Sequence, residues 1–367
     1  MIPELLLAFG LAAAPSPDPS AVLAAILSEV RAKRHFPGGV ALVSRRGVPV
    51  ASAAVGVRRE GGGEPVSIDD RFHLGSVTKP MNATMIATLV EEGKLEWDST
   101  LEQMFPDGPI HRELRAVTLA QLLSHRSGLA AFTSDAEMEE APKLYGDARA
   151  QRAQFAQWLL ARKPALTPGA QFAYSNAGIA IAAAAAERAA DRPWEDLMRE
   201  RVFKPLGMKS AGFGWPAYDD PKAPWGHQLD GTRLVPHDPH GPYQLNAVIQ
   251  PAGNVSVSVK DLGLFLDDHA RGIAGTPGLL KPATYARMHA LEPEGSALGW
   301  GVRKRDGVTT SSHSGSAETF YAIVQVVHED GLEIAVMLNS PDSVPATAIY
   351  RAIWERFRAG APPKPAG

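Results

Sequence analysis

A serine and a lysine three residues apart, Ser76 and Lys79, form the first group in this sequence that is able to carry chemistry. The helical pattern over residues 77–92 predicts a helix, which places both side chains on one face, one turn apart. A serine hydroxyl is a weak nucleophile and needs a nearby base. A lysine held in a dry pocket has a lowered pKa and can take up that proton. The pair therefore predicts a nucleophilic serine, with a simple helix N-cap as the alternative for Ser76.

A tyrosine and an asparagine two residues apart, Tyr174 and Asn176, form the second group, just before a helical pattern of small residues over 178–188. A nearby lysine ammonium stabilises a phenolate, which can then serve as general base and acid. Asn176 is suited to hold a substrate amide or to orient Lys79. The structural alternative is a core tyrosine whose hydroxyl caps a helix.

The third group is His313-Ser314-Gly315-Ser316, at the end of a predicted strand. A glycine there allows a substrate to lie close to the strand backbone. The backbone amides of Ser316 and Ser76 are then expected to pair as an oxyanion hole. The alternative is an ordinary polar strand end.

Composition excludes several other kinds of site. The chain has 367 residues and no cysteine, which excludes disulfides, thiolate zinc sites, iron–sulfur clusters and a cysteine nucleophile. The formal net charge of −3 argues against a nucleic-acid partner or a polybasic membrane role. His237, Asp238 and His240 cluster in the sequence but lack helical pairing and a third ligand, so we predict neither a metal nor a cofactor.

The elements that must position these groups follow from the hydrophobic periodicity. Strand patterns lie at both ends of the chain, and helical patterns fill the middle. This order predicts an α/β fold of the α+β type: an antiparallel sheet from both termini, flanked by helices, with a mainly helical inserted domain. We assign residues 21–75 and 286–360 to the sheet domain, 76–285 to the helical domain and 361–367 to a tail. The predicted strands are 40–43, 49–57, 300–304, 308–312, 319–327 and 332–338, and the predicted helices include 21–34, 119–123, 152–162, 261–270 and 349–357.

The N-terminal residues 5–14 form an apolar run that ends in three alanines and a proline-rich segment, which is typical of a signal peptide. The run has no basic residue before it and is shorter than the roughly 20 residues that a membrane span needs. We therefore predict a signal peptide and linker over residues 1–20, no membrane span, and a periplasmic or secreted protein. The alternative is a cytoplasmic one.

Taken in order, the three groups resemble the motifs of the serine β-lactamase and penicillin-binding superfamily, whose other branches carry S-x-x-K, S-D-N and K-T-G. The Tyr-x-Asn form is similar to the class C-like branch of β-lactamases, D,D-peptidases, D-aminopeptidases and related carboxylesterases. The resemblance extends over residues 21–358. It includes the stretches 122–129, 168–178, 251–254 and 299–301.

The resemblance implies a helical domain packed on an α/β domain, with the site in the cleft. It implies that Ser76 is acylated while Lys79 and Tyr174 move protons. It also implies an oxyanion hole from two backbone amides, and substrate contacts from Asn176, His313, Gly315 and Ser316.

Two residues depart from the pattern of the β-lactamases. His313 stands where those enzymes usually carry a lysine, and a neutral imidazole offers less fixed charge to a β-lactam carboxylate. Phe132 follows Gly128-Leu129 near the place where class C enzymes have a glutamine. We therefore expect a serine hydrolase that acts on small ester, amide or peptide-like substrates. The alternatives are an efficient class C-type β-lactamase and, from another class of protein, a penicillin-binding or sensor domain with little turnover.

Overall fold

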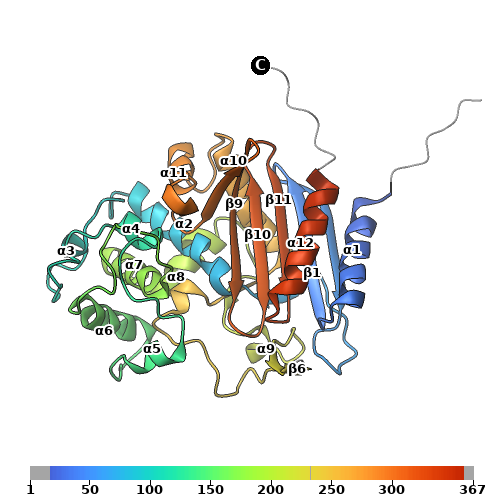
Figure 1. The fold of residues 1–367 in the computed structure, drawn as a ribbon, viewed down its shortest axis with the longest axis horizontal. Coiled ribbons are helices and arrows are strands. Elements are labelled where there is room, and N and C mark those ends of the chain that lie inside the picture. Colours follow the sequence, from blue (N-terminus) through green and yellow to red (C-terminus); the bar gives the residue numbers. More distant parts are fainter. Residues whose placement is uncertain (1–16, 232, 359–367) are drawn as a thin grey trace, which may run out of the picture.

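A computed structural model describes residues 17–231 and 233–358 and has at its centre a six-stranded antiparallel sheet (Figure 1). The first two strands of the chain pair with the last four, which confirms the predicted sheet from both termini. Residues 1–16, which carry the predicted signal-peptide core, lie outside the described residues. The strand order is β2 (Val48–Gly56), β1 (Gly38–Arg45), β11 (Leu332–Leu338), β10 (Tyr321–Val327), β9 (Val308–Ser316) and β8 (Gly301–Arg305).

The central strands are buried on both faces because the sheet is the middle layer of the molecule. On β1, Val40 and Leu42 enter one hydrophobic core, whereas Ala41 and Val43 enter the other. Successive side chains of a strand point to opposite faces, so a continuous apolar run serves both cores.

Two helices from the ends of the chain cover one face of the sheet. Helix α1 (Pro19–Lys33) and helix α12 (Ser343–Arg358) lie together on the right of Figure 1. Leu27 of α1 and Ile353 of α12 are fully buried in the core that these helices share with the sheet.

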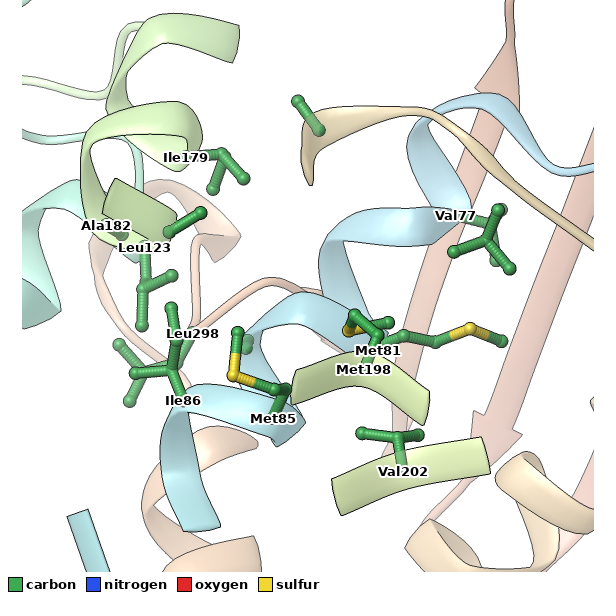
Figure 2. Packing of buried hydrophobic residues seen from close by; sticks show 14 of the residues in the cluster. Val77, Met81, Met85, Ile86, Leu123, Ile179, Ala182, Met198, Val202 and Leu298 are labelled. Carbon is green, nitrogen blue, oxygen red and sulfur yellow. The ribbon is translucent and has the colours of Figure 1, made fainter. Parts of the chain in front are cut away.

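The other face of the sheet packs against α2 (Thr78–Glu91) and α10 (Val259–Ile273), beyond which most of the remaining helices gather. Most of α2 is buried. Figure 2 shows Met81, Met85 and Ile86 of this helix among apolar side chains from other helices.

The other helices are α3 (Leu101–Met104), α4 (Leu119–Leu123), α5 (Asp135–Glu139), α6 (Ala148–Leu160), α7 (Asn176–Ala190), α8 (Trp194–Met198), α9 (Pro216–Asp219) and α11 (Pro282–Met288), with helical turns η1 (Gly75–Val77), η2 (Arg199–Phe203), η3 (Gln250–Ala252) and η4 (Pro293–Gly295).

Two small sheets have no counterpart among the predicted strands. One has the order β3 (Arg71–His73), β7 (Val255–Ser258) and β4 (Gly212–Phe213); the other pairs β5 (His227–Asp230) with β6 (Arg233–Pro236). Their strands have two to four residues, too few to show an alternating pattern. Strand β3 nevertheless matters for the site, because it leads directly into the turn that carries Ser76.

Within the described residues, none of the helices combines the length and the apolar character that crossing a bilayer requires.

Candidate active site

Ser76 lies in the short 3-10 turn η1, immediately before α2, instead of at the first position of the α-helix itself. Lys79 follows in the first turn of α2, and its Nζ lies 2.8 Å from the Ser76 Oγ. The spacing of three residues therefore brings the two side chains into contact, as predicted.

The amine of Lys79 is sealed inside the protein. The residue is fully buried, and its Nζ also donates to the backbone carbonyl of Ala252 at 2.8 Å. Burial penalises the charged ammonium and holds the pKa of Lys79 well below its usual value. A neutral amine is a base, so Lys79 is suited to accept the proton of Ser76.

Tyr174 approaches the same oxygen from the other side. Its hydroxyl donates to the Ser76 Oγ at 2.7 Å, and Lys79 Nζ lies 4.7 Å from the centre of its ring. Burial raises the pKa of Tyr174 to about 12, which is opposite to the phenolate expected from a neighbouring ammonium. The reason is that the same burial favours a neutral lysine. Burial therefore favours a neutral amine on Lys79 and a protonated phenol on Tyr174.

Two glycines allow strand β9 to approach the turn that carries Ser76. A side chain at Gly75, where φ is +51°, would lie 2.5 Å from the backbone nitrogen of Ser316. A side chain at Gly315 would lie 2.5 Å from the backbone nitrogen of Ser76. No Cβ fits at distances this short. The backbone of the turn that carries Ser76 and the backbone of β9 are therefore in direct contact. The amides of Ser76 and Ser316 are thereby placed in adjacent segments, as an oxyanion hole requires.

The register of β9 explains which of its residues face the site. His313 pairs with Val324 and Gly315 pairs with Ala322, and both partners belong to the core shared with the helices. Directly paired residues point to the same face of a sheet. His313 and Gly315 therefore face the helices and the nucleophile, whereas Ser314 points away. The predicted strand stopped at residue 312 because the Ser-His-Ser-Gly-Ser composition hides the continuation of the ladder.

His313 is neutral. Its Nδ1 lies 2.7 Å from the carbonyl oxygen of Ser314, to which it donates. Desolvation by burial is the main reason that the pKa of His313 is lowered to about 3. At pH 7 this position offers the lone pair of Nε2 to a ligand and no positive charge.

Asn176 begins helix α7 beside Ser175, whose hydroxyl accepts from the backbone N–H of Gly178 and caps the helix. The side-chain amide of Asn176 donates to the carbonyl oxygen of Phe132 at 2.9 Å. Phe132 itself packs its ring against Phe155 and Trp158 and has φ of +51°. The phenylalanine therefore presents its backbone, and not its ring, to Asn176.

His125 supports Tyr174. Its Nδ1 accepts the backbone N–H of Ser175 at 3.2 Å, and its ring lies 4.5 Å from the ring of Tyr174. His125 is buried, with φ of +58°. His125 therefore fixes the backbone segment that carries Tyr174.

Two pockets flank the nucleophile. One, of about 470 Å³, is lined by Ser76, Asn176, Tyr243 and Glu318; we call it the nucleophile-side pocket. The other, of about 460 Å³, is lined by Tyr174, His313, Phe172 and Arg303; we call it the tyrosine-side pocket. No motif in the sequence pointed to Glu318 or Arg303, because neither belongs to a recognisable pattern.

The histidines near residue 238 do not converge. His237 packs against Trp215, and His240 packs against Tyr218. Across residues 17–231 and 233–358, no group of three or more potential metal-ligating side chains is found.

A family model matches most of the chain. The family is described as Beta-lactamase, and the match covers residues 23–356.

Individual relatives of the chain differ in their named activities. It is 26% identical to "Penicillin-binding protein 4" of Amycolatopsis lactamdurans over 341 residues, which is 84% of this chain and 82% of that protein. It is 31% identical to "Esterase EstB" of Burkholderia gladioli over 209 residues, which is 53% of this chain and 51% of that protein.

Solved structures share the fold. A penicillin-binding protein homologue from Pyrococcus abyssi superposes with a TM-score of 0.76 at 23% identity, covering 92% of this chain and 77% of that one. The D-amino acid amidase of Ochrobactrum anthropi superposes with a TM-score of 0.73 at 20% identity, covering 93% and 100%.

Proposed function

This chain belongs to the β-lactamase family, and we propose that it is a serine hydrolase that cleaves ester or amide bonds through an acyl-enzyme on Ser76. The observation that carries the proposal is the convergence of two proton-transfer groups on one hydroxyl: Lys79 Nζ at 2.8 Å and the Tyr174 hydroxyl at 2.7 Å from Ser76 Oγ.

The lowered pKa of Lys79 and the raised pKa of Tyr174 suggest the order of proton transfers in acylation. Neutral Lys79 accepts the Ser76 proton while the serine oxygen attacks the carbonyl carbon of the substrate. The negative charge that develops on the carbonyl oxygen is met by the amides of Ser76 and Ser316. Tyr174 then gives its proton to the leaving group as the bond to the acyl carbon breaks. The products of this step are an acyl-serine, an ammonium on Lys79 and a phenolate on Tyr174.

Deacylation reverses the proton transfers. The Tyr174 phenolate, stabilised by the Lys79 ammonium, takes a proton from water while the hydroxide oxygen bonds to the acyl carbon. The ester bond to Ser76 then breaks, and Lys79 returns its proton to the serine oxygen. Each group thereby regains its resting state.

The absence of a positive charge at His313 supports ester and amide substrates. His313 is neutral, so this strand position lacks the cation that attracts a β-lactam carboxylate. Relatives named as an esterase and an amidase fit this picture, because neither substrate class needs that cation. We therefore place ester and amide hydrolysis ahead of efficient β-lactam hydrolysis.

The test is covalent labelling of the purified protein with a fluorophosphonate, followed by intact mass and peptide mapping. We expect one adduct on Ser76, its loss in Ser76→Ala, and its retention in Ser28→Ala, an exposed serine of α1. Turnover of a p-nitrophenyl ester is expected alongside. An adduct with penicillin and no turnover of any ester or amide would favour the sensor alternative. No adduct with either probe would overturn the proposal.

A further inference from the structure

A third pocket lies on the face of the sheet that carries α12. Its volume of about 590 Å³ falls within the range of small-molecule sites. Strands β8, β9 and β10 supply one side of it, through residues that include Arg303, Thr310 and Gln325, and helix α12 supplies the other, through residues that include Arg351 and Trp354. We call it the outer pocket.

The register of the sheet explains why Arg303 lies in the outer pocket. Arg303 pairs directly with Thr310, and Thr310 pairs with Val327, which belongs to the core shared with α1 and α12. Directly paired residues point to the same face of a sheet, and so do residues two apart on one strand. Arg303, Thr310 and Gln325 therefore face α12. This helix packs on β10 and β11, and β9 lies beyond its edge (Figure 1).

Positive charge prevails around the outer pocket, which is lined by four arginines and two acidic residues. Two of the arginines already have partners. Arg305 lies 3.5 Å from Asp306, and Arg358 pairs with Asp330.

The other two arginines, Arg303 and Arg351, are exposed and form no ion pair with any residue that the structure describes. The same holds for Glu355, the second acidic residue of the lining. These three side chains leave one net positive charge, which matches the single charge of a carboxylate. A guanidinium also has the geometry to bind a carboxylate through two hydrogen bonds.

The outer pocket combines this charge with apolar surface and a hydrogen-bond donor. Val308 and Trp354 supply the apolar surface. Gln325, which is 3% exposed, accepts the hydroxyl proton of Tyr350 on its Oε1, whereas its Nε2 has no hydrogen-bond partner within the described part of the chain. A buried donor without a partner is costly, so a ligand oxygen that accepts from Gln325 is stabilised there.

We propose that the outer pocket binds a small organic carboxylate, with its oxygens held by Arg303 and Arg351 and its apolar body against Trp354. This site adjoins the tyrosine-side pocket, because Arg303 and Gln325 line both. It is nevertheless a separate site, since Ser76 and Tyr174 are not among its lining residues. Binding there does not depend on the proposed function.

The experiment measures binding by isothermal titration calorimetry with three ligands that share one apolar body: phenylbutyrate, phenylbutyramide and phenylbutylamine. We expect the acid to bind at least about fivefold more tightly than the neutral amide, as for a partly exposed charge-assisted contact, and the amine to bind more weakly still. Added salt should weaken binding of the acid and leave binding of the amide unchanged.

Variants test which side chains hold the carboxylate. Arg303→Gln and Arg351→Gln should each raise the Kd of phenylbutyrate by about three- to tenfold, and the double variant should bind the acid no better than the amide. The matched controls are Lys304→Gln, the neighbour of Arg303 on β8, and Arg356→Gln, on the same helix as Arg351. Neither residue lines the outer pocket, so both controls should keep the affinity of the unmodified protein.

Tryptophan fluorescence locates the ligand. Binding of phenylbutyrate should change the fluorescence of the protein, and Trp354→Phe should abolish this change while the affinity measured by calorimetry is retained. A change that persists in Trp354→Phe would place the ligand elsewhere and overturn the proposal. Equal affinities for the acid and the amide, or unchanged affinity in both arginine variants, would overturn it as well.

Discussion

At the scale of single residues, the chemistry depends on burial more than on residue type. Lys79 and Tyr174 are ordinary side chains whose pKa values are changed by their surroundings. Exclusion of water lowers the pKa of the Lys79 amine and raises the pKa of the Tyr174 phenol to about 12. These opposite shifts are the reason that we propose Lys79 as the base and Tyr174 as the acid of the first step.

The pH profile checks this assignment. Activity requires a neutral Lys79, so kcat/KM on a neutral ester is expected to rise as pH increases through the lowered pKa of that lysine. It should then stay high, because Tyr174 loses its proton only near pH 12. Lys79→Arg, which stays charged, should lose about 10²–10⁴-fold in rate. Lys94→Arg, on an exposed loop, is the control. A rising limb near the usual lysine pKa of 10.5 would contradict the assignment.

His313 sets the charge of the strand that faces the nucleophile. Replacing it by lysine supplies the missing cation, and a carboxylate-bearing β-lactam should benefit. We expect His313→Lys to raise acylation by benzylpenicillin, relative to a neutral ester, by about tenfold. His240→Lys, which lies against Tyr218 outside the flanking pockets, should leave the ratio unchanged. An unchanged ratio in His313→Lys would show that charge at this position does not decide substrate choice.

At the scale of elements, a buried chain of hydrogen bonds ties the helix after the nucleophile to strand β9. Thr84 of α2 donates its hydroxyl proton to the Pro80 carbonyl and therefore accepts from the next member. With all three histidines neutral, each following side chain donates a hydrogen bond to the side chain that precedes it in this chain. Heavy-atom distances are 2.7–3.0 Å along His269, His289, Ser311 and His328. The chain keeps α2 and β9 in a fixed relation on either side of the site.

This chain makes the fold sensitive to acid. Burial lowers the pKa of the three histidines, to about 3 for His269, whereas they titrate near 6.5 when unfolded. The unfolded state therefore binds more protons below pH 6.5, and stability falls as pH decreases toward the folded values. A histidine that stays neutral in the folded state throughout this window contributes a slope of up to about 1.4 kcal/mol per pH unit.

Urea unfolding between pH 4.5 and 7.5 measures that slope. His289→Gln should reduce it by about one histidine's share, roughly 1.4 kcal/mol per pH unit. His328→Gln, at the half-buried end of the chain, provides a second variant if the first is too unstable. His111→Gln, on a surface loop, should leave the slope unchanged. An identical slope in all variants would contradict neutral, buried histidines.

A buried ion network holds three helices together away from the site. The guanidinium of Arg152 on α6 is fully buried and contacts Glu187 at 2.7 Å and Glu195 at 2.9 Å. Removing one partner from a buried network leaves an uncompensated charge.

We expect Arg152→Met to lower the free energy of unfolding by about 3–5 kcal/mol, because two carboxylates lose their partner. Arg162→Met, which removes an exposed pair with Glu140 at 3.7 Å, should cost less than about 1 kcal/mol. Chemical denaturation of the purified variants gives both values. Equal effects would show that the buried network contributes no more than a surface pair.

At the scale of the whole molecule, the two ends of the chain and its middle share one sheet. Strands β1 and β11 are adjacent although they are almost 300 residues apart, as the pair Gly39 and Leu338 shows. Alternate residues of these strands enter the two cores, so neither core is complete without the same strands.

Damage to one core should therefore destabilise the other. Ile353→Ala in α12 removes a fully buried side chain and is expected to cost about 2–5 kcal/mol. Hydrogen exchange should show the same loss of protection in α7, on the far side of the sheet, if the chain unfolds as one unit. Val344→Ala, at an exposed position of α12, is the control. Loss of protection confined to α1 and α12 would indicate independent domains.

The local features of this protein were readable from its sequence. Strand and helix periodicities predicted the six-stranded sheet and the long helices, because those patterns recur over enough residues to be distinctive. The pair Ser76 and Lys79 was predictable because one helical turn sets its geometry. The shortest strands were not predictable, because they have too few residues to show a pattern. The end of β9 was not predictable either, because its composition is too polar.

Only the tertiary structure decided what the groups do together. Tyr174 and Ser76 are 98 residues apart, and their contact depends on how the helices pack against the sheet. The proposed direction of each proton transfer and the neutrality of His313 likewise depend on burial and on proximity across distant segments. The physical reason is that residue types and spacing are local properties, whereas desolvation and electrostatic surroundings are produced by the whole folded chain.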